Sequence, residues 1–398
     1  MLKIAALLVW AGAAQGASYH FAAVWDGAKL WKDACVVTEG ERIASVGACG
    51  SGAIDLTKYT AIPGMIDVHT HMTYVLENRV SQAARAAAVV YLAQENARKT
   101  LETGVTTVRD LGAADYADIA MRDLIAGGQM AGPRMFVAGY GLMVTRGRTS
   151  TPNTADGVAE VLRVVRQQVG AGADVIKMYG STGSGRDVTG FQTFTYEEMK
   201  AACDAAHALG KKIAIHTYGP DGARDAVRAG ADSVEHATDM DDATIAEMAR
   251  RKTFYVPTID HNRYYVDNFR LLNYPPAAVD GLKDYIARNL ETAKKAWKAG
   301  VRFAMGSDAV YTMFGENTRE LGWFVKAGMT PEEALRTATG NGAALLGMEK
   351  SLGAIREGMF ADIAAVEGDP LTDIGVATGK VRWVMKGGKV AVDHTKER

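Results

Sequence analysis

From Pro63 to residue 352, short apolar runs alternate with amphipathic segments of helical length. The helical segments include residues 82–103, 156–169, 196–209, 242–251 and 278–299. The apolar runs end near eight residues: His71, Asp110, Tyr140, Lys177, His216, His236, Thr258 and Asp308. Eight strand–helix units over ~250 residues match the count and size of a (β/α)8 TIM barrel, so the sequence predicts an α/β fold of that class.

Glycines mark the joints between the predicted helices and strands. A glycine precedes an expected strand at five joints: Gly104, Gly172, Gly210, Gly230 and Gly300. A left-handed residue that ends a helix is most often glycine, so we expect these five to end the helices before the strands.

The two ends of the chain differ from the middle. Short β-like runs occupy residues 21–47, broken by Asp26-Gly27 and Glu39-Gly40, and return after Gly353. We therefore expect residues 18–62 and 353–398 to fold together as one small β-sandwich packed on a barrel of residues 63–352.

Residues 1–17 have the composition of a secretory signal peptide. Lys3 precedes an apolar stretch over residues 4–11, and small residues follow as far as Ala17. The stretch is too short to span a membrane as a mature helix, so we expect a cleavable signal and a periplasmic or secreted protein. The alternative is a buried N-terminal strand or helix in a cytoplasmic protein.

Charge and cysteine content narrow the range of partners. The 45 basic and 46 acidic residues give a formal net charge of -1, which offers no electrostatic case for binding nucleic acid or a membrane.

Three cysteines are too few for a disulfide framework, and we expect buried thiols, with a Cys35–Cys49 bridge as the alternative in an exported protein. A symmetric homo-oligomer is expected only from the frequency of such assemblies.

Residues that bind metals collect at the predicted strand ends. His69 and His71 project from one side of the first strand, because side chains alternate along a strand. Later runs end in Lys177, His216, His236 and Asp308. Functional residues of such barrels lie at the carboxyl ends of the strands, so these side chains are expected at one mouth. Imidazoles bind zinc at ~2.0–2.1 Å, and the set predicts a metal site.

This pattern resembles the amidohydrolase superfamily, in its binuclear branch with a carboxylated lysine. Residues 61–67 before the histidines and residues 353–362 near the end carry the resemblance further. It implies that His69, His71 and Asp308 bind one divalent ion, that His216 and His236 bind a second, and that both ions are zinc. Lys177, modified by CO2 to a carbamate, would bridge them, because an ammonium group has no lone pair to donate. An ion pair of Lys177 with a barrel carboxylate is the alternative.

The resemblance also implies a reaction. A hydroxide bridging two metal ions would attack an amide carbonyl, and Asp308, as the catalytic residue, would take the proton and pass it to the leaving amine.

Residues 175–185 and 256–262 are similar to the imidazolonepropionase-related group, which includes exported Xaa-Pro and Xaa-Lys/Arg dipeptidases. That likeness implies a metallo-dipeptidase or carboxypeptidase that cleaves the amide before the C-terminal residue of dipeptides or short peptides. An amidase of N-acyl amino acids or cyclic amides is the alternative enzyme. A barrel that binds a ligand or metal without catalysis is the alternative of a different class.

Three residues are candidates for substrate binding. Tyr218 lies two positions past His216 and is expected to offer its hydroxyl to the substrate, the alternative being a tyrosine bonded to a rim loop. Arg148 stands where relatives often carry Gly-Gly-His, and can clamp a free carboxylate or simply be a solvated loop charge. His261 follows the seventh strand and can contact substrate or serve a structural role. Residues 264–276 are expected to form a lid or a subunit contact.

Overall fold

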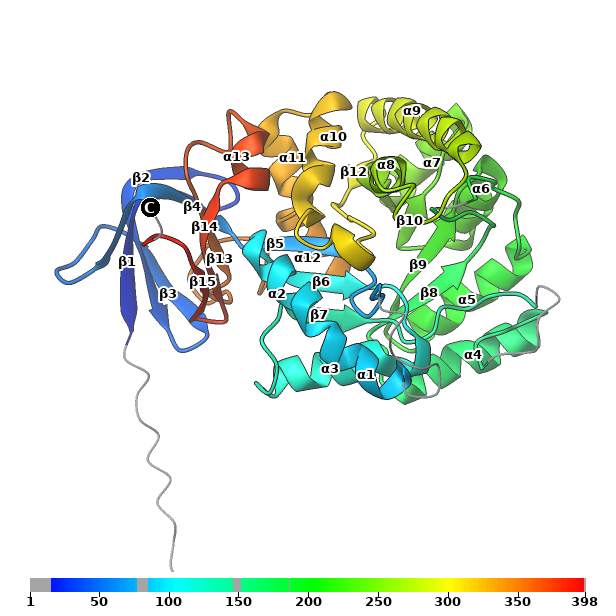
Figure 1. Cartoon of the computed structure of the whole chain (residues 1–398), viewed down its shortest axis with the longest axis horizontal. Helices are drawn as coiled ribbons and strands as arrows, with labels where there is room; N and C mark the ends of the chain where they lie inside the picture. The colour runs from blue at the N-terminus through cyan, green and yellow to red at the C-terminus, as the bar shows by residue number, and fades with distance from the viewer. Residues whose placement is uncertain (1–15, 77–84, 146–151, 186, 397–398) are drawn as a thin grey trace, which may run out of the picture.

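The computed structural model describes residues 16–76, 85–145, 152–185 and 187–396. A β-sheet built from both ends of the chain lies beside a larger α/β body (Figure 1). Nearly all of the expected signal peptide, and Arg148, lie outside the described residues. No helix in the described part of the chain is both long and apolar enough to cross a membrane.

The smaller unit is a seven-stranded sheet in the order β15-β14-β13-β4-β1-β2-β3. Its strands are β1 (Ala17–Trp25), β2 (Leu30–Glu39), β3 (Arg42–Gly47), β4 (Ile54–Pro63), β13 (Ile363–Val366), β14 (Val381–Lys386) and β15 (Lys389–Asp393). The two chain ends fold together as expected, in one continuous sheet that encloses a single core shared by Ile43 of β3 and Met385 of β14. The reason is β4, which pairs in parallel with β1 on one side and antiparallel with β13 on the other, so that the ends share one hydrogen-bonded ladder.

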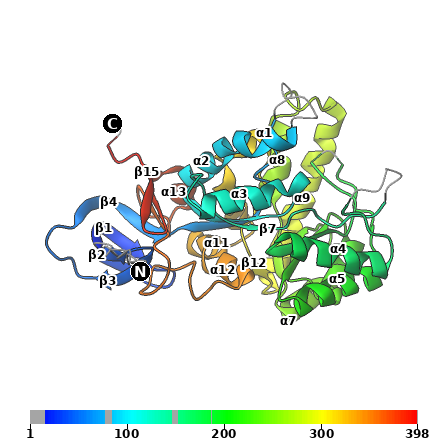
Figure 2. The same ribbon diagram turned by 90° about the horizontal axis from the view of Figure 1, so that it is seen from below.

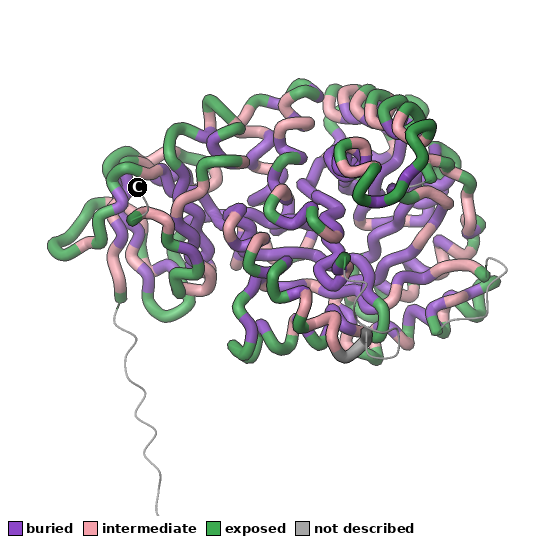
Figure 3. Tube along the Cα trace, in the orientation of Figure 1, coloured by how far each residue is buried: buried purple, intermediate pink, exposed green. Residues whose placement is uncertain are grey.

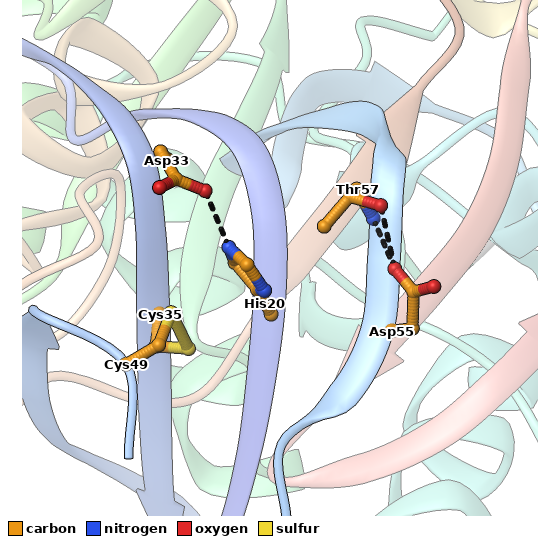
Figure 4. Close-up of a disulfide and its surroundings, with 6 residues drawn as sticks. All are labelled: His20, Asp33, Cys35, Cys49, Asp55 and Thr57. Atoms are coloured by element: carbon orange, nitrogen blue, oxygen red, sulfur yellow. Dashed lines mark hydrogen bonds and ion pairs between the residues drawn. A yellow bond between two sulfur atoms is a disulfide. The ribbon is translucent and has the colours of Figure 1, made fainter. Parts of the chain in front are cut away.

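A disulfide joins Cys35 in β2 to Cys49 in the loop after β3, with Cα atoms 5.0 Å apart (Figure 4). The expectation of three buried thiols is therefore wrong for this pair and right for Cys203, which is buried in α5 (Tyr196–Ala208). The register explains the pairing, because Cys35 lies opposite Gly47 and the chain returns to it two residues later.

The α/β body contains the eight expected strands, all parallel to their neighbours, in two sheets. A three-stranded sheet has the order β5-β6-β7, and a five-stranded sheet has the order β12-β11-β10-β9-β8. The strands are β5 (Met65–Thr70), β6 (Val105–Asp110), β7 (Arg134–Val137), β8 (Val175–Tyr179), β9 (Lys212–Thr217), β10 (Ser233–His236), β11 (Phe254–Val256) and β12 (Arg302–Phe303).

The ring of eight strands is present only in part, because no continuous ladder joins the two sheets. At one seam Asp174 N donates to Val137 O at 2.7 Å, and at the other Val68 N donates to Met305 O at 2.9 Å. The eighth strand is only two residues long. Beyond it Gly306 passes so close to His69 that a Cβ on the glycine would lie 2.7 Å from that of His69.

Helices surround these strands, and the buried backbone lies toward the middle of the body (Figures 2 and 3). They are α1 (Arg85–Leu92), α2 (Gln94–Glu102), α3 (Ala117–Ala126), α4 (Val158–Ala171), α5, α6 (Pro220–Ala229), α7 (Asp242–Arg251), α8 (Ile259–Asp267), α9 (Pro276–Lys298), α10 (Glu320–Lys326), α11 (Pro331–Thr337), α12 (Gly340–Leu346) and α13 (Ile374–Gly379), with short 3-10 turns η2 (Ala114–Tyr116), η3 (Tyr311–Met313) and η4 (Asn317–Arg319). All five glycines expected at the joints have a positive φ, as a left-handed ending of the preceding helix requires.

Candidate metal centre and substrate pocket

A cavity of about 820 Å3 opens at the carboxyl ends of the parallel strands. All six residues expected as metal ligands line it: His69, His71, Lys177, His216, His236 and Asp308. Ligand atoms of His69, His236 and Asp308 lie within 4.8 Å of one another, and all three side chains are buried. The six residues that the sequence analysis grouped together therefore line one cavity in the structure.

Local backbone geometry turns two of these side chains into the cavity. On β10, Ser233 and Glu235 contact each other inside the body, so strict alternation would send His236 to the other side. His236 instead has φ 72°, which ends the alternation. Asp308 has φ 52°, also in the left-handed region that side chains adopt rarely. Such conformations persist where the surrounding structure enforces them, and they are common at functional sites.

Three of the histidines have one ring nitrogen engaged away from the site. Nδ1 of His69 lies 2.7 Å from Glu235 Oε2, Nδ1 of His71 lies 3.0 Å from Gly112 O, and Nδ1 of His236 lies 2.6 Å from Thr258 Oγ1. This arrangement leaves Nε2 available to a metal ion.

The fourth histidine also fits a metal site. Nε2 of His216 is buried and has no hydrogen-bond partner in the described part of the chain. Burial lowers the pKa of His69 to about 4 and holds the pKa values of His216 and His236 well below the usual range. Neutral imidazole is the form that binds a metal, so His69, His216 and His236 fit a metal centre.

Asp308 occupies the middle of the group. Its Oδ1 lies 3.3 Å from His71 Nε2 and 3.5 Å from His69 Nε2, and its Oδ2 lies 3.3 Å from His261 Nε2. Burial opposes ionisation, but the neighbouring histidines, His261 first among them, hold the pKa of Asp308 well below its usual value. Asp308 is therefore a carboxylate that can both bind a metal and accept a proton.

Lys177 is buried, and its Nζ lies 3.4 Å from His69 Nε2. Burial lowers its pKa to about 8, so a substantial fraction is neutral near that pH. An ion pair requires a carboxylate oxygen within 4.0 Å of Nζ, and none of the described carboxylates has one there. The structure therefore does not support the alternative of a simple ion pair. Carbamate formation on this amine stays a prediction.

Sequence reasoning missed the residues that hold the ligands in place. Arg109 Nη2 lies 2.9 Å from Glu235 Oε1, and its Nε donates to Val68 O at 2.5 Å. Despite burial, Arg109 and His69 lower the pKa of Glu235 to about 2. Asp67 accepts hydrogen bonds from Ser307 N at 2.9 Å and Asn317 Nδ2 at 3.0 Å, which ties β5 to the segment that carries Asp308. One sequence signal could have found them. Side chains two positions apart on a strand lie on the same side, so Glu235 shares the side of Ser233, and Asp67 shares the side of His69.

The substrate side of the cavity contains two of the three candidates. Tyr218 and His261 line it and are buried, whereas Arg148 lies outside the described residues. The Tyr218 hydroxyl makes no hydrogen bond of normal geometry to a described residue. Burial raises its pKa well above the usual value, against the smaller effect of the nearby Asn262 amide. Five further tyrosines line the cavity, and the sequence analysis gave none of them a role in substrate binding, although residues 264–276, which include two of them, were expected to form a lid or a subunit contact. They are Tyr74, Tyr179, Tyr265, Tyr274 and Tyr311.

Parallel strands flanked by helices, with buried histidines and an acid at their carboxyl ends, define a metal-dependent hydrolase of α/β fold. The model of the Amidohydrolase family matches residues 60–391, and the chain belongs to this family.

Known relatives are similar over most of the chain. The ochratoxinase of Aspergillus niger is 30% identical over 367 residues, covering 83% of this chain and 75% of that protein. The imidazolonepropionase of Symbiobacterium thermophilum is 27% identical over 386 residues, covering 87% and 84%. The crystal structure of a Xaa-Pro dipeptidase with methionine bound in its active site superposes with a TM-score of 0.86 and 31% identity, covering 94% of this chain and 99% of that one.

Proposed function

We propose that this amidohydrolase is a binuclear metallo-dipeptidase that cleaves the amide bond before the C-terminal residue of dipeptides or short peptides. The observation that carries the proposal is the cavity, in which all six expected ligands surround a space large enough for a dipeptide. The similarity to a Xaa-Pro dipeptidase over nearly its whole length supports the same substrate class.

In this proposal the ligands divide as the resemblance implies. His69, His71 and Asp308 would hold one ion, His216 and His236 would hold the other, and Lys177 as a carbamate would supply oxygen ligands to both. Zinc is the ion best matched to these nitrogen and oxygen donors. Two such ions supply an activated water and polarise the substrate carbonyl.

The protein's own side chains move the proton. Asp308 is ionised and accepts it as water attacks the amide carbon. His261 donates Nδ1–H to the Asp308 main-chain oxygen at 2.8 Å, so its Nε2 carries the lone pair that faces Asp308 Oδ2. That nitrogen can take the proton from Asp308 and deliver it to the leaving amine. The Tyr218 hydroxyl, which makes no hydrogen bond of normal geometry to a described residue, would donate to the carbonyl oxygen or the substrate carboxylate.

The test is hydrolysis of dipeptides with free and amidated C-termini by zinc-loaded protein, chelator-treated protein and the variant Asp308→Asn. We expect metal-dependent cleavage of the free acids only, lost by at least ~100-fold in the variant because a positioned acid–base group contributes that much. Equal cleavage of amidated peptides would contradict the C-terminal requirement and with it the proposed clamp at Arg148.

Two other outcomes would change the assignment. Cleavage of N-acyl amino acids or cyclic amides but no dipeptide would favour the second candidate, an amidase, which the likeness to ochratoxinase and imidazolonepropionase supports. A zinc-loaded protein inactive on every amide would indicate a barrel that only binds.

We also propose export to the periplasm or medium after removal of residues 1–17. The disulfide supports this, because such bonds persist in oxidising compartments. N-terminal sequencing of the mature protein from its native host checks it, and an intact Met1 would contradict it.

A further inference from the structure

One wall of the cavity is apolar. The segment that runs from α8 into α9 supplies Tyr265, Leu271, Leu272 and Tyr274. Leu272 is buried, whereas Leu271 is 56% exposed at the mouth of the cavity. Large apolar side chains are thus arranged from the solvent inward.

This wall reaches the residues that would move the proton. The ring of Tyr265 lies 4.8 Å from the ring of His261, whose Nε2 faces Asp308. Tyr274 stacks on Tyr265 with ring centres 5.5 Å apart and an angle of 11°. A Cβ on Gly185 would lie 2.1 Å from Tyr265 Cε2, so the backbone of Gly185, in the segment after β8, lies directly against the same ring. An amide held at Asp308 would place a neighbouring side chain against this layered surface.

The described side chains of the wall carry no charge. Among the described residues that line the cavity, Asp308 is the one carboxylate and Lys177 the one non-histidine cation, and both belong to the metal centre. A charged side chain of the substrate placed against the wall would lose hydration without gaining an ion pair from it, whereas an aromatic or aliphatic side chain would gain from burial.

We propose that the apolar wall formed by Tyr265, Leu271, Leu272 and Tyr274 selects substrates in which a residue flanking the scissile amide has a large uncharged side chain. Phenylalanine, leucine and methionine are of this kind. The inference rests on the proposed amide hydrolysis and narrows it: where the C-terminal residue faces the wall, the Xaa-Lys and Xaa-Arg substrates expected from the sequence are disfavoured.

The experiment compares kcat/KM for Ala-Phe, Phe-Ala, Ala-Leu, Ala-Pro, Ala-Lys and Ala-Glu, and for the N-acetyl amino acids of the same C-terminal residues. We expect phenylalanine and leucine substrates to exceed lysine and glutamate substrates at least tenfold, since binding differences in apolar pockets are of that size. The order of Ala-Phe and Phe-Ala identifies which side of the amide faces the wall.

A charge placed in the wall provides the second measurement. Leu271→Glu, at an exposed position where folding tolerates it, should reduce the phenylalanine-to-lysine ratio at least fivefold while zinc content stays unchanged. Leu209→Glu is the matched control, because Leu209 is 43% exposed and outside the cavity lining, and it should leave the ratio as it is.

The outcomes separate the two proposals. Dipeptides cleaved equally well with charged and apolar residues, or an unchanged ratio in Leu271→Glu, would overturn the role of the wall and leave the dipeptidase assignment standing. Apolar preference among N-acetyl amino acids alone would support the wall and reject the dipeptidase. Failure of every substrate with zinc-loaded protein would reject both.

Discussion

At the scale of single residues, Glu235 joins the metal centre to the interior of the fold. One carboxylate oxygen faces His69 and the other faces Arg109, so a single side chain fixes the imidazole and neutralises a buried guanidinium. Truncating Arg109 would leave the buried Glu235 carboxylate without its charged partner, which is strongly unfavourable. Such partners of a metal ligand orient it and increase its basicity.

Glu235→Gln should therefore lower zinc affinity by about 10- to 100-fold, the usual effect of losing a partner of this kind. The amide keeps the shape but removes the charge that faces His69 Nδ1. Competition with a chromogenic chelator measures the affinity, and circular dichroism confirms that the variant folds. Glu247→Gln is the control, because Glu247 forms its ion pairs with Arg250 and Arg251 at the surface. Equal zinc affinity of both variants and the wild type would contradict the role of Glu235.

At the scale of elements, the start of α8 depends on a buried carboxylate from α10. Glu320 accepts Ile259 N–H at 2.9 Å and Asp260 N–H at 2.8 Å, and it is fully buried. The first turn of α8 carries His261, so Glu320 fixes the helix that places an imidazole beside Asp308. Burial raises the pKa of Glu320 to about 8, and this outweighs the two N–H groups that favour its ionised form.

A raised pKa in the folded state makes stability depend on pH in a definite direction. Below the ordinary pKa near 4.3 the carboxyl is protonated in both states, and from there to about pH 8 the folded state binds more protons, so stability falls as pH rises. Gln cannot ionise, so the Tm advantage of wild type over Glu320→Gln should be largest near pH 5 and shrink toward pH 8. Scanning calorimetry at both values measures it. Glu291→Gln, at an exposed position on α9, controls for surface charge. A difference that stays constant with pH would exclude the buried carboxyl as its cause.

Sequence patterns predicted these elements unequally. Helix periodicity placed 242–251 with the bounds of α7, and glycine joints located the strand starts, because both signals are local. The eighth strand was predicted to continue to Asp308, but the close approach of Gly306 to His69 ends it at Phe303, and only tertiary packing reveals that contact. The ligands were found because each ends an apolar run. Glu235 was not, because an ordinary buried strand position looks the same in sequence, and the segment 264–276 was noticed without its role in the cavity lining being found.

At the scale of the whole molecule, the seven-stranded sheet and the metal centre depend on different bonds. The Cys35–Cys49 bridge closes a loop of sequence separation 14 within the sheet. Loss of such a loop constraint costs about 3 kcal/mol. The double variant Cys35→Ser/Cys49→Ser should lose about that much unfolding free energy in urea while keeping zinc content and kcat/KM. Reductant should lower the unfolding free energy of the wild type by the same amount and leave that of the variant unchanged. An equal effect of reductant on both proteins would contradict the stabilising role of the disulfide.

The metal ions should in turn connect the two parallel sheets. His69 and His71 come from the three-stranded sheet, whereas Lys177, His216 and His236 come from the five-stranded sheet, so the proposed ligands bridge a ladder that is discontinuous. An ion that binds only the folded state adds stability in proportion to the logarithm of its concentration over Kd, about 2.7 kcal/mol at 100 Kd. Chelation should therefore lower Tm and abolish hydrolysis, and zinc should restore both.

The loss should also be local. Hydrogen exchange should accelerate at the seam amides of Val68 and Asp174, which donate across the two gaps, more than at Phe21 in the seven-stranded sheet. Phe21 serves as an internal reference because its strand lies outside the proposed ligand set, so its protection reports the stability of the molecule as a whole. Equal acceleration at all three amides would mean that the ions stabilise the protein without holding the sheets together.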